Sequence, residues 1–238
     1  MIQKHHDVLE LKNIHKGQRA FILGNGYSAM YYDSEKMAMN GTLIGCNRAF
    51  EVHPLTYLIF QDRALANVCG KFTGIKICPY RKALHEHLDS KTTFYVNFVK
   101  HSEKDSFDFT HSGGLALQIA CFMGFDEILL VGCDCCFLDS GGGKLTSNIF
   151  EDKHYKRIAG KPHTQKKAEK RNNGVTTVGS LERFAKIFKS IYNKNKGAQF
   201  IRKMGHWGIV DIPHIEYEGF WTDYHPERAA HYVRTNRG

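Results

Sequence analysis

The sequence predicts an α/β domain with a doubly wound (Rossmann-like), mostly parallel sheet and a long basic lid loop. Short apolar runs alternate along the chain with segments of helical pattern, which is typical of this class. The run at 127–131 (EILLV) is continuously apolar, as expected of a strand covered on both faces. A small-residue turn at 24–28 (GNGYS) follows a strand, and another at 112–114 (SGG) opens a helix.

The alternation gives the elements in chain order. We expect strands at about 19–24, 42–46, 56–61, 74–78, 92–96, 127–132 and 198–202. We expect helices at about 28–38, 63–69, 80–88, 113–123 and 179–195. Gly124 separates the buried helix from the strand that follows it, as glycine commonly does after a helix.

The length of 238 residues suits one α/β domain, so residues 1–238 are interpreted as a single unit. Its core spans 19–137, a lid loop covers 138–177, and 178–238 hold the last helix, a strand and a C-terminal extension. A loop as long as 138–177 usually covers a functional site or is disordered. The aromatic, His-rich segment beyond Met204 is expected to pack over the sheet edge.

Composition excludes several classes of protein. Hydrophobic content of 42% with 12% aromatic residues is typical of a folded chain. No apolar run reaches about 18 residues, so no membrane-spanning segment is expected. The polar N-terminus carries no signal pattern. The number of cysteines, seven, is odd, which argues against a disulfide framework. A cytoplasmic location is therefore expected. The spacing of Cys133, Cys135 and Cys136 does not match a zinc site, and no structural metal site is predicted there.

The net charge of +9 is concentrated in residues 153–171. Such a run attracts phosphates on a nucleotide, a nucleic acid or a membrane surface. Lys153, Arg157 and Lys161 are therefore the candidates for phosphate contacts. The alternative interpretation is a solvated loop that keeps the chain soluble.

Polar side chains follow the expected strands at the point where each strand ends. They are Asn25, Asn47, Gln61, Asp62 and Asp134. The carboxyl ends of parallel strands meet at one edge of the sheet, which is where ligands bind in open α/β folds. Amides there could read a base or ribose, and either aspartate could hold a hydroxyl or Mg²⁺. Taken singly, each residue could equally be a helix cap or a turn residue.

Two turns complete the predicted site. The turn at 112–114 opens a helix and exposes backbone N–H groups to an anion, which brings in His111, Ser112, Gly113 and Gly114. The turn at 24–28 permits close backbone approach to a ligand and adds Gly24, Gly26 and Ser28, although a plain βα turn explains it as well.

Histidine supplies the candidates for acid–base chemistry because it titrates near neutrality. The chain has 14 histidines, and His154 and His163 stand out because they lie in the basic lid beside cations. Those cations could neutralise a phosphate leaving group. The fragment GGGKLTS does not match a phosphate loop, so a kinase of that type is excluded.

Four features in this order resemble a known superfamily. They are the GNGYS turn at 24–28, Cys46–Asn47, Gln61–Asp62, and the segment from Ser112–Gly113 to Asp134. Residues 19–137 are similar to the superfamily that joins bacterial CMP-sialic-acid-dependent sialyltransferases with archaeal 6-hydroxymethylpterin diphosphokinase-like (MptE-like) proteins.

The resemblance implies a nucleotide site in which Asn25, Gly26, Asn47, Gln61, Ser112 and Gly113 contact the nucleotide. Three positions depart from the pattern. Phe109 replaces an arginine, Cys136 replaces a tyrosine, and Asn173–Gly174 stand where a catalytic histidine is expected.

Three functions therefore remain open. The first is a sialyltransferase-like glycosyltransferase with a CMP- or UDP-linked sugar donor and an anionic acceptor such as a glycan or nucleic acid. There, His154 or His163 would deprotonate the acceptor, and Asp134 is a further catalytic candidate. The second is a Mg²⁺-dependent MptE-like diphosphokinase with Asp62 and Asp134 near the metal. The third is a non-catalytic protein that binds nucleotide or nucleic acid.

Overall fold

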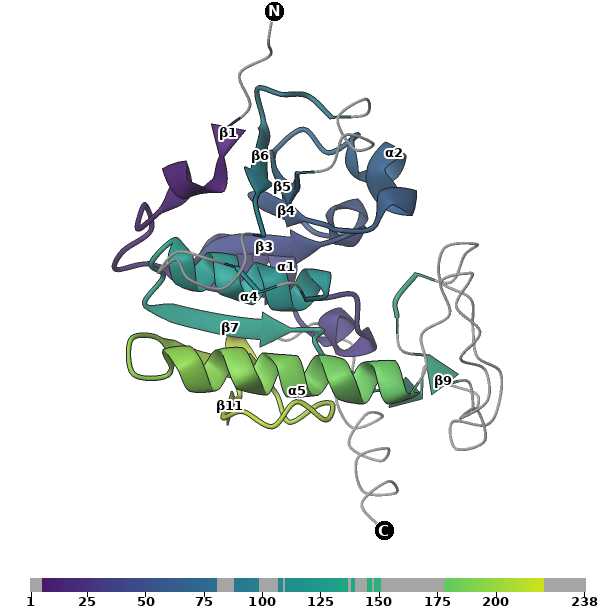
Figure 1. Ribbon diagram of the computed structural model, residues 1–238. Coiled ribbons are helices and arrows are strands. Elements are labelled where there is room, and N and C mark those ends of the chain that lie inside the picture. The colour runs from purple at the N-terminus through teal and green to yellow at the C-terminus, as the bar shows by residue number, and fades with distance from the viewer. Residues whose placement is uncertain are drawn as a thin grey trace, which may run out of the picture.

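The computed structural model describes residues 6–80, 88–98, 107–108, 110–136, 138–139, 145–146, 148–150 and 178–220. Within these residues the main sheet has nine strands in the order β1-β6-β5-β4-β3-β2-β7-β10-β11. Every neighbouring pair of strands in this sheet is parallel (Figure 1). The predicted α/β class with a parallel sheet is confirmed.

The strands are short, and most of their residues are buried. They are β1 (His6–Asp7), β2 (Arg19–Leu23), β3 (Thr42–Cys46), β4 (Tyr57–Ile59), β5 (Ile75–Pro79), β6 (Thr93–Val96), β7 (Glu127–Val131), β10 (Phe200–Met204) and β11 (His214–Ile215). A separate antiparallel pair joins β8 (Leu138–Asp139) to β9 (Leu145–Thr146).

The order of strands reverses between β2 and β7. From β2 the chain adds β3, β4, β5 and β6 in one direction, and it then returns to place β7 on the other side of β2. In open α/β sheets the crevice at such a switch point is where ligands bind. The carboxyl ends of β2 and β7 therefore mark the expected position of a site.

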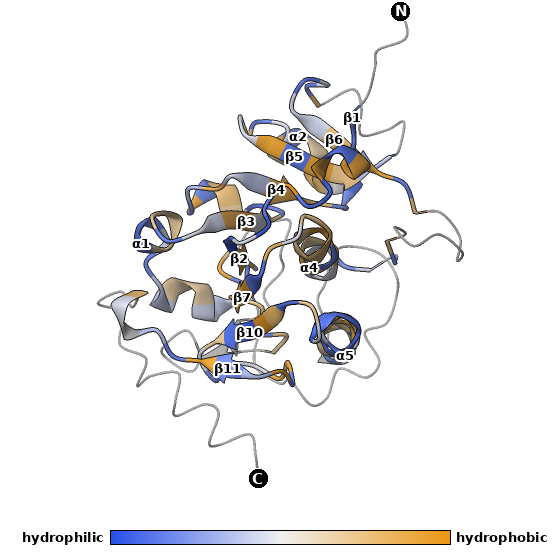
Figure 2. Cartoon of the chain, turned by 90° about the vertical axis from the view of Figure 1, so that its left-hand side faces the viewer, coloured by the Kyte–Doolittle hydropathy of each residue, from blue (hydrophilic) through white to orange (hydrophobic). Residues whose placement is uncertain are grey.

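Helices cover both faces of the sheet. They are α1 (Ser34–Ala38), α2 (Ala66–Cys69), α4 (Ser112–Phe122) and α5 (Val178–Asn195), with 3-10 turns η1 (Val8–Leu11), η2 (Tyr27–Tyr31), η3 (Ala49–Glu51), η4 (Arg63–Leu65) and η5 (Glu218–Phe220). Figure 2 shows α4 and α5 on one side of the sheet and α1 on the other. Helix α4 packs on both the sheet and α5, which explains why it is apolar on all sides.

Two element predictions need correction. The single helix expected at 28–38 is instead η2 followed by α1, because the carboxylate of Asp33 accepts hydrogen bonds from the backbone N–H groups of Glu35 and Lys36 and starts a new helix. The strand expected at 198–202 runs from Phe200 to Met204, since a turn follows α5 before Phe200 pairs with Glu127. The helix expected at 80–88 falls almost wholly outside the described residues.

The described residues contain no helix long and apolar enough to cross a membrane. Strand β11 pairs with β10 at the edge of the sheet, so the part of the C-terminal segment that is described adds to the same sheet.

A buried lysine supports the outer half of the sheet. Lys76 on β5 is only 2% exposed, and its ammonium group donates hydrogen bonds to the carbonyls of Phe72 (2.8 Å) and Gly74 (3.2 Å) and to Thr92 Oγ1 (2.8 Å). Burial lowers the pKa of Lys76. The lysine thus joins the turn before β5 to the segment before β6.

We predict that Lys76→Met lowers the free energy of unfolding by about 1–3 kcal/mol, because hydrogen bonds from a charged donor are lost and two carbonyls lose their partner. Urea denaturation of the variant measures this loss. Lys71→Met is the matched control, since Lys71 is exposed. Equal stability of Lys76→Met and Lys71→Met would contradict this role.

Candidate functional site

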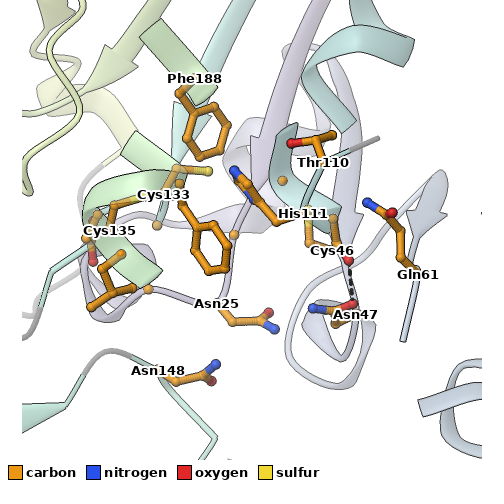
Figure 3. Close-up of a pocket in the computed structure, with 18 of the residues that line it drawn as sticks. Asn25, Cys46, Asn47, Gln61, Thr110, His111, Cys133, Cys135, Asn148 and Phe188 are labelled. Atoms are coloured by element: carbon orange, nitrogen blue, oxygen red, sulfur yellow. Dashed lines mark hydrogen bonds between the residues drawn. The ribbon is translucent and has the colours of Figure 1, made fainter. Parts of the chain in front are cut away.

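A cavity of about 380 Å³ lies at the carboxyl ends of the central strands, at the switch point. It is lined by residues that follow β2, β3, β4 and β7, by the start of α4, and by α5 (Figure 3). The sequence-predicted residues among them are Gly24, Asn25, Gly26, Asn47, Gln61, Asp62, His111, Ser112, Gly113 and Asp134.

The other predicted residues fall into two groups. Ser28 lies behind the cavity and bonds Asp134, and Gly114 lies within the first turn of α4. His154, His163, Lys153, Arg157 and Lys161 lie outside the described residues, so their roles stay predictions.

The turn after β2 approaches the end of β7 very closely. Gly24 N–H donates to the carbonyl of Val131 (2.8 Å), and Gly26 N–H donates to that of Gly132 (2.7 Å). A Cβ atom at Gly26 would come within 2.4 Å of the Gly132 oxygen and 2.6 Å of Asp134 Oδ2. Only glycine fits there without displacing the backbone.

Asp134 joins this turn to β7. It is 3% exposed, and Oδ2 accepts from Ser28 N–H (2.9 Å) while Oδ1 accepts from the Ser28 hydroxyl. Burial raises the pKa of Asp134, and the hydrogen bonds from Ser28 act in the opposite direction. Both carboxylate oxygens are therefore engaged by the protein, which favours a positioning role over the catalytic role expected from the sequence.

The start of α4 is tied to the end of β3. Ser112 Oγ donates to Asn47 Oδ1 (3.0 Å), and Asn47 adopts a left-handed conformation with φ of 54°. Asn tolerates this conformation better than most residues. His111 caps the helix, because its Nδ1 accepts from Gly114 N–H (3.2 Å).

Several buried polar atoms on the cavity wall have no hydrogen-bond partner among the described residues. They are Asn25 Oδ1, both amide atoms of Gln61, Thr110 Oγ1 and His111 Nε2. Buried polar groups are nearly always satisfied in native proteins, and an unmade hydrogen bond there costs about 1–3 kcal/mol. Their concentration around one cavity indicates a site for a polar ligand.

His111 is a neutral residue at working pH. Burial lowers its pKa to about 4, and its ring packs against Phe184 with centroids 4.4 Å apart. Since Nδ1 accepts the cap bond, the proton of the neutral ring is on Nε2. This histidine is a hydrogen-bond donor and a helix cap, and a pKa so low does not suit a general base.

Sequence reasoning missed part of the lining. Thr110 and Asn148 add polar atoms, and Leu181, Phe184 and Phe188 of α5 form an apolar wall beside the thiols of Cys46, Cys133 and Cys135. The wall could have been found from the amphipathic pattern of α5 only if its packing on α4 were known. Within the described residues no group of three or more His, Cys, Asp or Glu side chains could hold a metal ion.

Comparison with known proteins shows which solved structures resemble this chain. No family model and no curated protein sequence matches the chain. Among solved structures, the MAf glycosyltransferase from Magnetospirillum magneticum AMB-1 matches with a TM-score of 0.56 and 13% identity, over 97% of this chain. The chain has the fold of that glycosyltransferase. It spans 40% of the length of the glycosyltransferase chain.

Two sialyltransferases of Campylobacter jejuni also match. Cst-I has a TM-score of 0.46 at 12% identity, over 92% of this chain and 94% of its own. CstII, in complex with the substrate analogue CMP-3FNeuAc, has a TM-score of 0.43 at 12% identity, over 78% of this chain and 80% of its own. The match to the MAf glycosyltransferase confirms the fold class expected from the sequence. Membership of the sialyltransferase-like superfamily, including its MptE-like branch, stays a prediction.

We predict that His111 makes stability depend on pH. The pKa of His111 is about 4 in the folded chain, against 6.5 for an ordinary histidine side chain in the unfolded chain. As pH falls below 6.5, the unfolded state therefore binds a proton that the folded state does not yet bind. The contribution of neutral His111 to the free energy of unfolding is fully present above pH 6.5 and is lost as pH falls toward 4. Between pH 7 and pH 5 the free energy of unfolding should therefore drop by about 2 kcal/mol. Urea denaturation of wild type and His111→Asn at both pH values measures it. Asn keeps a cap without titrating, so parallel pH profiles would refute the assignment.

We also predict that Gly26→Ala destabilises the fold by about 1–3 kcal/mol, because the new Cβ would overlap the Gly132 carbonyl and Asp134. Gly197→Ala is the control, since a Cβ atom at Gly197 meets nothing within 4 Å. Thermal unfolding of both variants makes the comparison. A Gly26→Ala variant as stable as the control would show that the turn relaxes freely.

Proposed function

We propose that the chain is a nucleotide-dependent transferase, specifically a sialyltransferase-like glycosyltransferase that uses a nucleotide-sugar donor. The observation that carries the proposal is the group of amide, hydroxyl and imidazole atoms around one cavity at the switch point that have no hydrogen-bond partner among the described residues. The shared fold with a glycosyltransferase supports the reaction class. A CMP- or UDP-linked donor follows from the sequence resemblance.

In this proposal the amides of Asn25, Asn47 and Gln61 read the base and ribose, since amide groups both donate and accept. The start of α4 faces the donor phosphate with backbone N–H groups and the positive end of the helix dipole. His111 adds an Nε2–H donor at the same wall. All of these groups are neutral, so they bind an anion without presenting a fixed charge.

Group transfer needs further residues. An acid–base group for the acceptor hydroxyl is assigned to His154 or His163 in the lid segment, and Lys153, Arg157 and Lys161 would neutralise the leaving phosphate. An anionic acceptor, a glycan or a nucleic acid, suits the basic lid. Exclusion of water by this segment would limit hydrolysis of the donor.

A non-catalytic nucleotide-binding protein is the second candidate, and one observation favours it. Among the described lining residues, His111 has a pKa too low for a base and Asp134 is engaged by Ser28. Catalysis would then depend on Asp62 or on residues outside the described part of the site. The Mg²⁺-dependent diphosphokinase remains an alternative that metal dependence would reveal.

We predict that CMP or UDP raises the thermal stability of the protein in EDTA. A nucleotide at about 100 times its dissociation constant adds roughly 2.7 kcal/mol to the free energy of unfolding. The screen compares CMP, UDP, GDP, ADP and ATP, each with EDTA and with Mg²⁺. A response confined to ATP with Mg²⁺ would favour the diphosphokinase, and no response to any nucleotide would sink the proposed site.

Matched variants locate the binding. Gln61→Ala should weaken nucleotide binding about tenfold or more, because two buried polar atoms of the site are removed. Gln199→Ala is the control, since Gln199 Oε1 is likewise buried without a partner in the described chain but does not line the cavity. Transfer of the sugar to an acceptor would then identify an enzyme, whereas donor binding without transfer would identify the non-catalytic alternative.

A further inference from the structure

The short segment 148–150 lies against the turn at 24–28. The backbone N–H of Ile149 donates to the carbonyl of Asn25 (2.8 Å). Asn148 lines the cavity, and Figure 3 shows it beyond Asn25, on the side away from His111. Asn148 Oδ1 accepts from Phe150 N–H (2.9 Å), a hydrogen bond within the segment itself.

A contact outside the cavity fastens this segment at a second point. The guanidinium of Arg48 lies 4.5 Å from the centre of the Phe150 ring. Arg48 is itself held by Glu51, with Nε 2.6 Å from Oε1, and its side chain is 13% exposed. A cation over an aromatic face is more stabilising when it is shielded from water. Neither Arg48 nor Phe150 lines the cavity.

The two fixed points bracket the predicted nucleotide residues. Ile149 bonds Asn25, the second residue after β2, and the ring of Phe150 lies against Arg48, which follows Asn47 after β3. Between them, Asn148 is placed at the cavity wall near Asn25, whose Oδ1 is buried without a partner in the described chain. Two asparagines from distant parts of the sequence therefore line the same side of the cavity.

We propose that Arg48 and Phe150 are positioning residues that hold 148–150 at the site, so that Asn148 contacts the bound ligand together with Asn25. The part of the ligand that suits two amide side chains is a polar, uncharged edge. This inference rests on the proposed function for the identity of the ligand, and on the contacts above for the placement of the segment.

The test uses Phe150→Ala in the full chain, with Phe200→Ala as the matched control. Phe200 carries a similar pair, with Arg202 5.9 Å from its ring, at the start of β10 and away from the cavity. Phe150→Ala should weaken binding of CMP or UDP about three- to tenfold by calorimetry, which corresponds to loss of one shielded cation–aromatic contact. Phe150→Trp should restore it, and Phe200→Ala should leave it unchanged.

A double-mutant cycle tests whether Phe150 acts through Asn148. If it does, the double variant should bind the nucleotide less than about twofold more weakly than Asn148→Ala alone, because the group that Phe150 positions is already gone. Full additivity of the two losses, or equal affinity of Phe150→Ala and wild type, would overturn the proposal.

Hydrogen exchange keeps the test independent of the nucleotide. The Ile149 amide should exchange faster in Phe150→Ala than in wild type without any ligand, and it should be unchanged in Phe200→Ala. Unchanged exchange at Ile149 in Phe150→Ala overturns the positioning role even if nucleotides bind. Failure of wild type to bind any nucleotide counts against the proposed function instead.

Discussion

The site depends on the contact between Asp134 at the end of β7 and Ser28 in the turn after β2. The carboxylate takes both the backbone N–H and the hydroxyl of Ser28, and Gly26 donates to the carbonyl of Gly132 beside it. On the other side, Ile209 N–H donates to the Asp134 carbonyl. One buried aspartate thus fixes three segments of backbone, and the cavity wall follows their positions.

This arrangement separates support from recognition. The titratable side chains that hold the fold, such as Asp134 and Lys76, are buried and form hydrogen bonds with other groups of the protein. The groups that face the cavity without partners in the described chain are neutral, as in Asn25, Gln61 and His111. Apart from the carboxyl groups of Asp62 and Asp134, the described polar lining offers hydrogen bonds without charge. Such a lining suits a ligand whose own charge is balanced elsewhere, and the proposed function gives that part to the basic lid.

The sequence was sufficient for the sheet and for most of the rim, because buried parallel strands are continuous apolar runs and their ends meet at one edge. It could not reveal β1 or β11, since two-residue strands leave no pattern. It missed Asn148 and Phe184 because they reach the cavity through tertiary packing. The cap formed by His111 and the engagement of Asp134 by Ser28 also depend on atomic contacts, which residue type alone does not give.

The separation of Ser28 and Asp134 along the chain has a consequence for folding. The two residues lie 106 positions apart, and the strands they follow are paired in the middle of the sheet. Closing so large a loop costs entropy before the contact is made, and such non-local pairing slows folding. The cavity therefore forms only when the centre of the sheet is complete, so the ability to bind a ligand should arrive late, as the chain reaches its native topology.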